Sequence, residues 1–238
     1  MDTNILFFPE IDSTNSYALE HLDQLMDGTM IVADSQTAGR GRFARKWVSD
    51  SGNVHMSIVL KPDSLNYKLI SGIGLFVAVI ISRVLEDYKV SSQIKWPNDI
   101  LVGGKKIGGI LVESSIQGSV LRGLVVGIGL NLQLPDTSLI SQPVTALCQH
   151  IPIVNRDEVV RKVNSIFFKA YREFSVLGVP SIRDEYLRKM KVLSKVTIQI
   201  GTSTITGKIR GIDAQGNLEI ERDSGTIVVI NSGEIIDK

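Results

Sequence analysis

The chain has 238 residues, enough for one or two domains, and its 43% hydrophobic content is that of an ordinary globular protein. The 26 basic and 25 acidic residues leave a net charge of +1, which argues against a chain-wide attraction to nucleic acid or to an anionic membrane. The single cysteine, Cys148, excludes a disulfide framework and favours a reducing, cytoplasmic setting.

The N-terminal half predicts helices and strands without a signal peptide or a membrane span. The start carries no basic segment, and the longest uncharged apolar stretch, residues 69–82, is shorter than the roughly 20 residues that cross a bilayer. A helix is predicted from the capping residues at 12–15 to near Gly28, since Ala18, Leu22 and Leu25 recur at helical spacing. The other predicted elements of this half are a strand over 30–35, a loop over 36–47, a strand over 54–60, a helix over 68–88, and strands over 93–96, 100–102, 106–113 and 120–132, with hairpin turns at 103–104 and 117–118.

The C-terminal half begins with helices and ends in short strands. Asn155 is predicted to cap a helix that ends at Gly178, and a shorter helix is predicted over 181–190. We therefore expect an α+β fold of two domains, a mixed body over residues 1–191 and a small all-β module over residues 192–238. The strands predicted in the small module cover 196–200, 204–212, 218–221 and 226–230.

The most informative segment is the glycine- and arginine-rich loop over residues 36–47. Gly39 and Gly41 let the backbone turn tightly and approach a ligand, and guanidinium groups fit carboxylates and phosphates. Trp47 adds a flat ring on which a purine can stack. The loop therefore indicates an anion-binding site, with a plain solvated loop and a nucleic-acid contact as alternatives. Its four cations are Arg40, Arg42, Arg45 and Lys46.

Three further clusters bring polar groups to strand ends. Pro97 breaks a strand, so the following Asp99 is predicted either to cap a turn or to aim its carboxylate at a pocket. Lys106 precedes two glycines that leave room for a flat ligand, and it is either an exposed lysine or a second cation for the same anion. The glycines before Asn131 likewise lead to an amide that either closes a strand or pairs with an adenine edge.

The histidines show no metal-binding pattern. His21, His55 and His150 lie far apart without the spacing of a zinc site, so we assign no metal ligand to them. We expect His55 to be either exposed or satisfied by a hydrogen bond, and Cys148 to be a small apolar core residue.

Taken in order, these clusters resemble the motifs of biotin–protein ligases, and the match extends over nearly the whole chain. The resemblance implies a catalytic domain similar to class II aminoacyl-tRNA synthetases, with a mixed sheet and flanking helices, followed by an SH3-like β-barrel. It implies that biotin and MgATP give biotinyl-5′-AMP and pyrophosphate, and that the adenylate acylates a lysine of a biotin carboxyl carrier protein, such as an acetyl-CoA carboxylase subunit. The matching segments are residues 13–15, 36, 39–42, 45–47, 95–99, 106–109 and 127–131.

The resemblance also implies roles for individual residues. Arg42 and Lys106 would neutralise the biotin carboxylate and the α-phosphate, and Asp99 would lie near the incoming lysine, so these are the three expected catalytic residues. Mg²⁺ is expected with ATP, and its protein ligands are left open. Biotin would contact Ser13, Thr14, Asn15, Gln36, Arg40, Gly41, Arg42, Lys106 and Gly109. The nucleotide would contact Arg42, Arg45, Lys46, Trp47, Asn98, Lys106 and Asn131.

The sequence departs from the family pattern in three places. Ala44 follows Phe43 where the pattern favours glycine, so we expect a stiffer loop, and residues 231–234 lack a paired glycine. The chain begins close to Ser13, so the resemblance implies the short form, without an N-terminal DNA-binding domain and without DNA or membrane partners. Pairing of two copies through strand edges is left open. The alternatives are a lipoate– or octanoate–protein ligase or transferase on the same core and, from another class, a non-enzymatic nucleic-acid-binding module.

Overall fold

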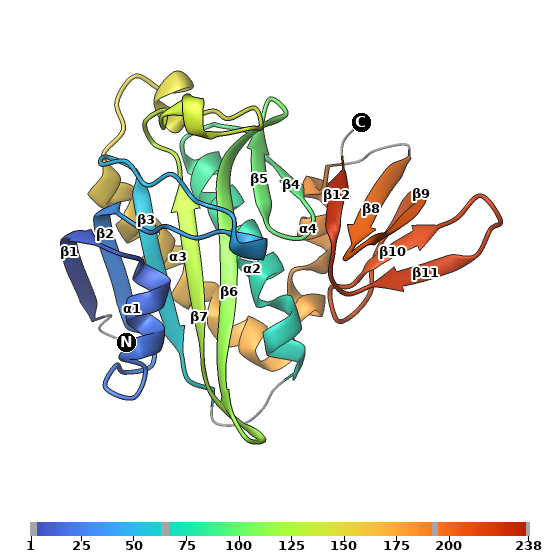
Figure 1. Ribbon diagram of the computed structural model, residues 1–238, viewed down its shortest axis with the longest axis horizontal. Coiled ribbons are helices and arrows are strands. Elements are labelled where there is room, and N and C mark those ends of the chain that lie inside the picture. The colour runs from blue at the N-terminus through green and yellow to red at the C-terminus, as the bar shows by residue number, and fades with distance from the viewer. Residues whose placement is uncertain (1–3, 63–66, 192–194, 237–238) are drawn as a thin grey trace.

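The computed structural model describes residues 4–62, 67–191 and 195–236, which form a larger and a smaller unit (Figure 1). The larger unit contains strands β1 (Ile5–Ile11), β2 (Met30–Gln36), β3 (Val54–Leu60), β4 (Gln93–Lys95), β5 (Asp99–Val102), β6 (Lys105–Gln117) and β7 (Val120–Leu130). Its helices are α1 (Thr14–Glu20), α2 (Tyr67–Asp87), α3 (Arg156–Leu177) and α4 (Arg183–Lys189). The smaller unit contains strands β8 (Val196–Ile200), β9 (Ser203–Ile212), β10 (Leu218–Glu221), β11 (Ile227–Ile230) and β12 (Glu234–Ile236).

The two units are built on separate sheets. The larger sheet has seven strands in the order β1-β2-β3-β7-β6-β5-β4, and the smaller has five in the order β11-β10-β9-β8-β12. Strands β1 and β2 run parallel, whereas the other neighbouring pairs of the larger sheet and all pairs of the smaller sheet run antiparallel. The expected mixed α+β fold with a C-terminal all-β part is therefore confirmed.

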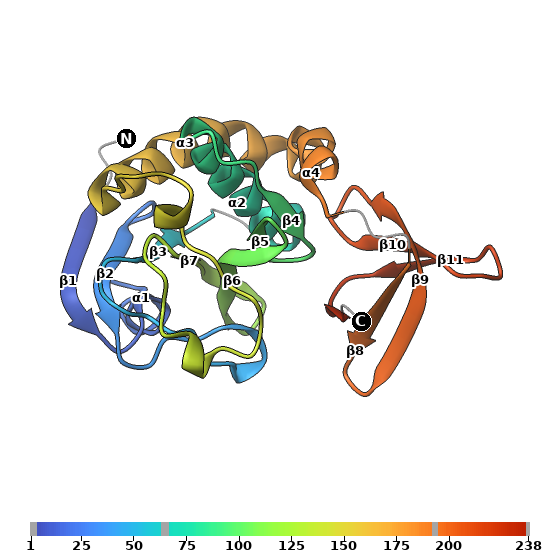
Figure 2. The same ribbon diagram turned by 90° about the horizontal axis from the view of Figure 1, so that it is seen from above.

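Helices cover both faces of the larger sheet (Figure 2). Helices α2 and α3 pack on the face that carries Met56 and Ile58, and α1 packs on the face that carries Val59. Strand β3 is consequently buried along its whole length, although its alternation predicted only one apolar face. His55, on this strand, is 2% exposed, so of the two expectations for it exposure is wrong.

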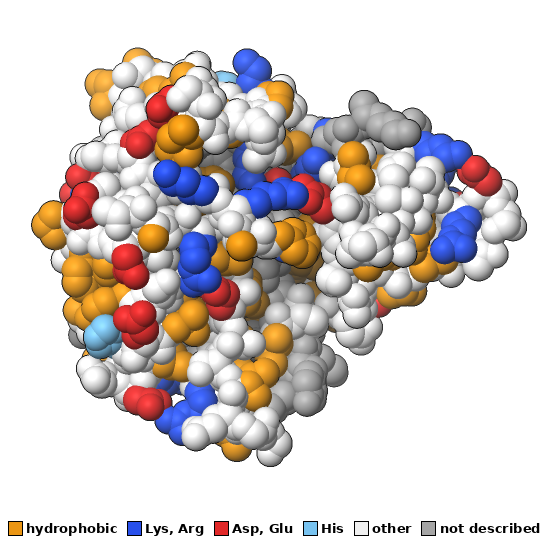
Figure 3. Space-filling view, in the orientation of Figure 1, with side chains coloured by type: hydrophobic (Ala, Val, Ile, Leu, Met, Phe, Trp, Pro, Cys, Tyr) orange, Lys and Arg blue, Asp and Glu red, His pale blue; other side chains and the backbone are white. Residues whose placement is uncertain are grey.

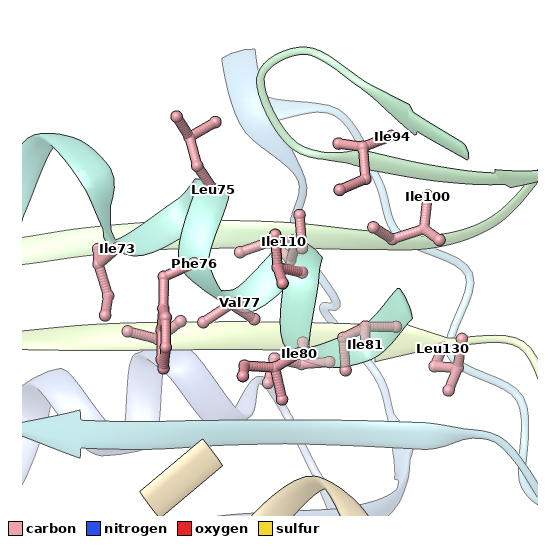
Figure 4. Packing of buried hydrophobic residues seen from close by; sticks show 14 of the residues in the cluster. Ile73, Leu75, Phe76, Val77, Ile80, Ile81, Ile94, Ile100, Ile110 and Leu130 are labelled. Atoms are coloured by element: carbon pink, nitrogen blue, oxygen red, sulfur yellow. The ribbon is translucent and has the colours of Figure 1, made fainter. Parts of the chain in front are cut away.

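Helix α2 lies at the centre of the core. Its side chains are apolar on nearly every side, which is typical of a helix enclosed by other elements. Figure 4 shows Phe76, Val77 and Ile80 of α2 among residues from β6 and β7. Phe76 also stacks on Phe174 of α3, with the ring centres 4.4 Å apart. The prediction of a buried helix here is confirmed.

Most predicted boundaries lie within a few residues of the observed ones, with three exceptions. Helix α1 ends at Glu20 instead of near Gly28, because the chain turns back on itself after His21 while Leu22 and Leu25 stay buried. The edge strand β1 was not predicted, since Pro9 interrupts its pattern, and proline is tolerated on an edge strand. The three-residue strand β12 was too short to give a pattern.

The smaller unit contacts the larger one through backbone groups. Gly216 has φ +86, and a Cβ on it would lie 2.5 Å from the Leu75 side chain of α2. Its carbonyl accepts a hydrogen bond of 3.2 Å from Trp96 Nε1. Arg183 of α4 donates to the carbonyl of Ile212 at 3.0 Å. These contacts hold the smaller unit beside α2, α4 and the turn after β4. Among the described helices, none combines the length and the apolar composition needed to cross a membrane.

Candidate functional site

One cavity collects the clusters that the sequence analysis singled out. It lies between the start of α1, the loop after β2, strands β6 and β7, and β12 of the smaller sheet. On the face shown in Figure 3, Lys and Arg side chains gather over the middle of the larger unit and toward its junction with the smaller one, with acidic side chains among them. The predicted site residues that line the cavity are Ser13, Thr14, Asn15, Gln36, Arg40, Gly41, Arg42, Arg45, Lys46, Trp47, Asn98, Asp99, Lys106 and Gly109.

A polar network around the start of α1 forms one end of the cavity. Ser13 caps this helix, with its Oγ accepting from Ser16 N at 3.4 Å. Thr14 donates from its backbone nitrogen and its hydroxyl to Gln36 Oε1, at 2.8 and 3.2 Å. Gln36 Nε2 in turn donates to Ser49 Oγ at 2.8 Å. These bonds fix the donors and acceptors of this end before a ligand enters.

Asn15 lies on the floor of the same end and is 4% exposed. Its Nδ2 donates to Glu113 Oε2 at 2.8 Å and to the carbonyl of Leu111 at 3.3 Å. Its Oδ1 accepts from Ser57 Oγ at 2.6 Å. A Cβ on Gly127 would overlap the Asn15 amide, so this strand glycine makes room for a side chain of the site.

Ion pairs hold the basic loop at two points. Arg40 donates two hydrogen bonds of 2.9 Å to Glu113 on β6. Arg45 pairs with both carboxylate oxygens of Glu234 on β12. The Arg45–Glu234 hydrogen bond is the largest cause that raises the pKa of Arg45 and lowers the pKa of Glu234. The smaller unit therefore contributes a charged group to the cavity.

The middle of the loop has an unusual backbone. Phe43 and Ala44 have φ values of 55° and 57°, in the left-handed region that favours glycine. These are the positions at which the sequence departs from the family pattern. Phe43 and Ala44 therefore adopt left-handed backbone angles although both carry a Cβ, and this strains the backbone of the loop.

Trp47 occupies the space that the strand glycines leave open. A Cβ on Gly129 would lie 2.5 Å from the indole ring, and one on Gly109 would lie 3.2 Å from it. We expected a flat ligand at the Gly108–Gly109 stretch, whereas the group that packs there is the ring of Trp47. Lys106 Nζ lies 5.4 Å from the centre of the same ring, so the indole and the ammonium share one wall.

The two cations expected to act together both line the cavity. Arg42 donates to Asn98 Oδ1 at 3.3 Å and to the carbonyl of Gly233 at 3.2 Å, and desolvation by burial lowers its pKa. Lys106 Nζ forms an ion pair of 2.7 Å with Asp99 Oδ1, and both side chains are largely buried. Guanidinium, ammonium and carboxylate are thus partly buried in one cavity, where charge interactions are stronger than in bulk water.

Asn131 is the predicted site residue that the structure does not bring to the lining. It is 4% exposed, and its Nδ2 donates to the carbonyl of Thr145 at 3.1 Å. Its backbone groups bond to Ile107 and Leu147. These bonds favour the structural alternative, in which the amide closes the end of a strand.

His55 lines the cavity, although the sequence analysis gave it no role. Its Nε2 lies 3.1 Å from the carbonyl of Asp50, which can only accept, so Nε2 carries the hydrogen and Nδ1 is an acceptor. Desolvation by burial lowers its pKa, so the ring is neutral at neutral pH. In the part of the chain that the structure describes, His55 Nδ1 and Trp47 Nε1 are buried without a hydrogen-bond partner. The acceptor His55 Nδ1 and the donor Trp47 Nε1 are therefore available to a ligand.

Besides His55, three further contributors to the site were not predicted: Ser57, Glu113 and Glu234. Ser57 and Glu113 are polar residues within apolar strands, and such positions signal a polar cavity. Glu234 is 189 positions from Arg45, so no local pattern pairs them. Within the described ranges, no group of three or more His, Cys, Asp or Glu residues is placed to hold a metal ion.

Two family models match the chain. The model described as "Biotin/lipoate A/B protein ligase family" matches residues 7–131, which include the basic loop and most of the cavity lining. The model described as "Biotin protein ligase C terminal domain" matches residues 194–236, which include all five strands of the smaller sheet.

Named relatives and solved structures align along most of the chain. The "Bifunctional ligase/repressor BirA" of Bacillus subtilis is 32% identical over 236 residues, which cover 94% of this chain and 71% of the relative. The "Biotin--[acetyl-CoA-carboxylase] ligase" of Paracoccus denitrificans is 30% identical over 229 residues, 92% of this chain and 94% of the relative. The structure of the biotin protein ligase from Aquifex aeolicus in complex with biotin and ATP is similar with a TM-score of 0.80, at 30% identity, over 98% of this chain and 97% of that one.

Proposed function

The chain belongs to the biotin/lipoate A/B protein ligase family, and on that basis we propose that it activates biotin with ATP and joins biotin to a lysine of a carrier protein. Relatives named as biotin ligases and a similar ligase solved with biotin and ATP support this reaction. The observation that carries the proposal is that Arg42 and Lys106, from separate segments, line one cavity whose far end is polar. The relatives' names indicate a carrier from acetyl-CoA carboxylase or a similar carboxylase.

In the first step, a carboxylate oxygen of biotin attacks the α-phosphorus of ATP, and the bond to pyrophosphate breaks. Two anions must approach, and negative charge shifts in the transition state, so cations held in advance lower the barrier. Arg42 and Lys106 supply these charges, and Trp47 holds the adenine. Mg²⁺ enters bound to ATP as part of the substrate.

In the second step, the amine of the carrier lysine attacks the acyl carbon of the adenylate, and AMP leaves. A free lysine has a pKa of about 10.4, so the amine must lose a proton before it attacks. Asp99, already paired with Lys106 at 2.7 Å, lies in the same cavity and either orients the incoming ammonium or accepts its proton. Exclusion of water by the loop protects the mixed anhydride between the two steps.

The same family membership supports a finer description of the architecture. We propose that the larger unit has a core like that of class II aminoacyl-tRNA synthetases, that the smaller unit is an SH3-like barrel, and that the boundary lies near Lys191. Helix α4 ends at Lys189, β8 begins at Val196, and separate family models match the two sides.

Intact-mass spectrometry of a biotin-accepting domain tests the proposed function. After incubation with the protein, biotin and MgATP, the domain should gain the mass of one biotin, and omission of ATP should abolish the gain. Because the family model also names lipoate, the matched assay uses lipoate or octanoate with a lipoyl-accepting domain, which should stay unmodified. Transfer of lipoate or octanoate in place of biotin would contradict the proposal, as would the absence of any ATP-dependent gain.

A further inference from the structure

Glu113 connects two parts of the cavity that have separate tasks in the proposed reaction. Its side chain, on β6, is 24% exposed. Its Oε2 accepts from Asn15 Nδ2 at 2.8 Å, and its two oxygens accept from the Arg40 guanidinium at 2.9 Å each. Asn15 belongs to the polar end of the cavity and Arg40 to the basic loop. One carboxylate therefore joins the floor of the site to the segment that covers it.

The contacts of Asn15 fix the direction of its amide. The carboxylate of Glu113 and the carbonyl of Leu111 only accept, so the amide nitrogen faces them and uses both of its hydrogens. The Ser57 hydroxyl, 2.6 Å away, donates to Oδ1. The second lone pair of Oδ1 is what Asn15 can offer to a ligand. Glu113 thereby presets Asn15 as an acceptor for a ligand N–H.

We propose that Glu113 is a positioning residue that couples occupancy of the biotin end to closure of the basic loop. While the loop is closed, Arg40 holds the carboxylate where it orients Asn15. When Arg40 leaves, Glu113 loses two charge-assisted hydrogen bonds and is free to turn away from Asn15. Coupling between two sites is reciprocal, so a ligand that fixes Asn15 also favours the Arg40 pair. The identity of that ligand as biotin rests on the proposed function, whereas the coupling inside the protein does not.

Limited trypsin digestion of the ligand-free protein tests this coupling, because the loop offers cleavage sites after Arg40, Arg42, Arg45 and Lys46. In Glu113→Gln, the amide oxygen can keep the contacts of Oε2 with Asn15 and Arg40, but an NH2 donor replaces the Oε1 that accepts from Arg40, so this hydrogen bond and the charge of the pair are lost. We expect cleavage after Arg40 to rise about fivefold, the factor for a partly exposed ion pair of ordinary strength. Fragment masses identify the site of each cut.

Asn15→Asp is the decisive variant, because the hydrogen bonds that join Asn15 to Arg40 run through the Glu113 carboxylate. It leaves the sequence of the loop unchanged but replaces the Nδ2 donor with an oxygen, so Glu113 loses this hydrogen bond and, when both carboxylates are ionised, is also repelled. The same increase of about fivefold is expected after Arg40. Circular dichroism and thermal unfolding show whether this variant folds. If it does not, Asn15→Ala takes its place in the test, because it removes the donor to Glu113 without adding a charge.

The matched control is Asp23→Asn, which breaks the exposed Arg122–Asp23 ion pair away from the cavity and should leave loop cleavage unchanged. Wild-type cleavage in the Asn15 variants, together with faster cleavage in Glu113→Gln, would show that Glu113 holds the loop alone and would overturn the coupling. Wild-type cleavage in Glu113→Gln would overturn the proposal altogether.

Steady-state kinetics supply the second arm of the test. Since the proposal gives Glu113 a positioning role through Asn15 and Arg40, Glu113→Gln should raise the KM for biotin about tenfold and change kcat at saturating biotin less than about twofold. Glu113→Asp, which keeps the carboxylate, should recover part of the biotin affinity. A lower kcat with an unchanged KM would overturn the positioning role. Failure of the wild-type protein to bind biotin would contradict the proposed function, and the ligand-free digestion would still decide on the coupling.

Discussion

Arg42 and Lys106 are held in different ways inside the same cavity. Arg42 bonds to the neutral oxygens of Asn98 and Gly233, whereas Lys106 faces the carboxylate of Asp99. Desolvation by burial lowers the pKa of Arg42 and outweighs the opposite effect of the Asp99 and Glu234 carboxylates, so the charge of this guanidinium is incompletely compensated. Such a guanidinium attracts an anionic ligand more strongly than a solvated one does. When an anionic ligand enters, Lys106 must either leave Asp99 for the ligand or pair with both.

Removal of either cation should slow formation of the adenylate. Arg42→Ala and Lys106→Ala are each expected to reduce the rate by about 10²–10³-fold, the usual scale for one lost transition-state donor. Release of pyrophosphate from ATP and biotin measures this step. Arg122→Ala, which removes an arginine outside the cavity, is the control. A wild-type rate in either cavity variant would exclude that residue from the reaction.

Asp99→Asn should separate the two steps. The variant keeps the size of the side chain but loses the charge that meets the carrier lysine. Because it also frees Lys106 from its ion pair, adenylate formation should stay at the wild-type rate or rise, while carrier acylation falls. Single-turnover transfer from preformed adenylate measures the second step alone. If the rates of both steps fell equally, the role of Asp99 would be limited to positioning Lys106.

At the scale of secondary-structure elements, β6 and β7 form one wall of the site. Glycines on these strands leave space where other residues would place side chains. Gly109 and Gly129 are directly paired across the two strands, and Trp47 lies over both. Strand glycines were recognised in the sequence as places for a close approach. The identity of the approaching group was missed, because Trp47 lies far away in the chain and no spacing rule links it to β7.

Gly129→Ala should therefore displace the indole and weaken nucleotide binding. A Cβ at this position would lie 2.5 Å from the ring, too close to be accommodated without movement. We expect the KM for ATP to rise about tenfold, on the scale of one lost aromatic contact. Gly74→Ala in α2 is the control, since its Cβ meets only an ordinary contact of 3.7 Å and should leave the KM for ATP unchanged. An unchanged KM in Gly129→Ala would contradict the role of Trp47.

The elements themselves were largely predictable, and the failures have physical causes. The observed bounds of strands β3, β8 and β10 are the predicted ones, because each strand coincides with an alternating or apolar run. Helix α3 ends before Gly178, which has φ 67°. Strand β1 contains a proline, and β12 is too short for a pattern. Both faces of β3 are buried because helices from distant parts of the sequence pack on them, and the local pattern of β3 cannot predict such contacts.

At the scale of the whole molecule, the smaller unit completes the cavity through Gly233 and Glu234. The glycine carbonyl holds Arg42 and the carboxylate holds Arg45. Sequence analysis placed a C-terminal β module correctly but gave it no site residue, because these contacts span most of the chain. The loop cations were predicted from composition alone, whereas their partners depend on the tertiary fold.

The Arg45–Glu234 pair predicts a pH dependence of stability. The hydrogen bond with Arg45 lowers the pKa of Glu234 below its usual value of 4.5, so the stabilisation is present above that value and is lost as the pH falls through the lowered pKa. Both side chains are partly exposed, at 62% and 36%, so the gain at neutral pH is at most about 1 kcal/mol. Urea unfolding of wild type and Glu234→Gln should show a difference at pH 7 that vanishes in acid. A difference that persists in acid would contradict this assignment.

A structure of the protein crystallised with a non-hydrolysable analogue of biotinyl-5′-AMP tests the central claim most directly. The quantity to measure is the distance from the Arg42 guanidinium and from the Lys106 ammonium to the oxygens of the phosphate–acyl linkage. We predict that both lie within hydrogen-bond distance, about 2.7–3.2 Å, of that one group. An analogue bound elsewhere, or with either cation facing away from the linkage, would contradict the account.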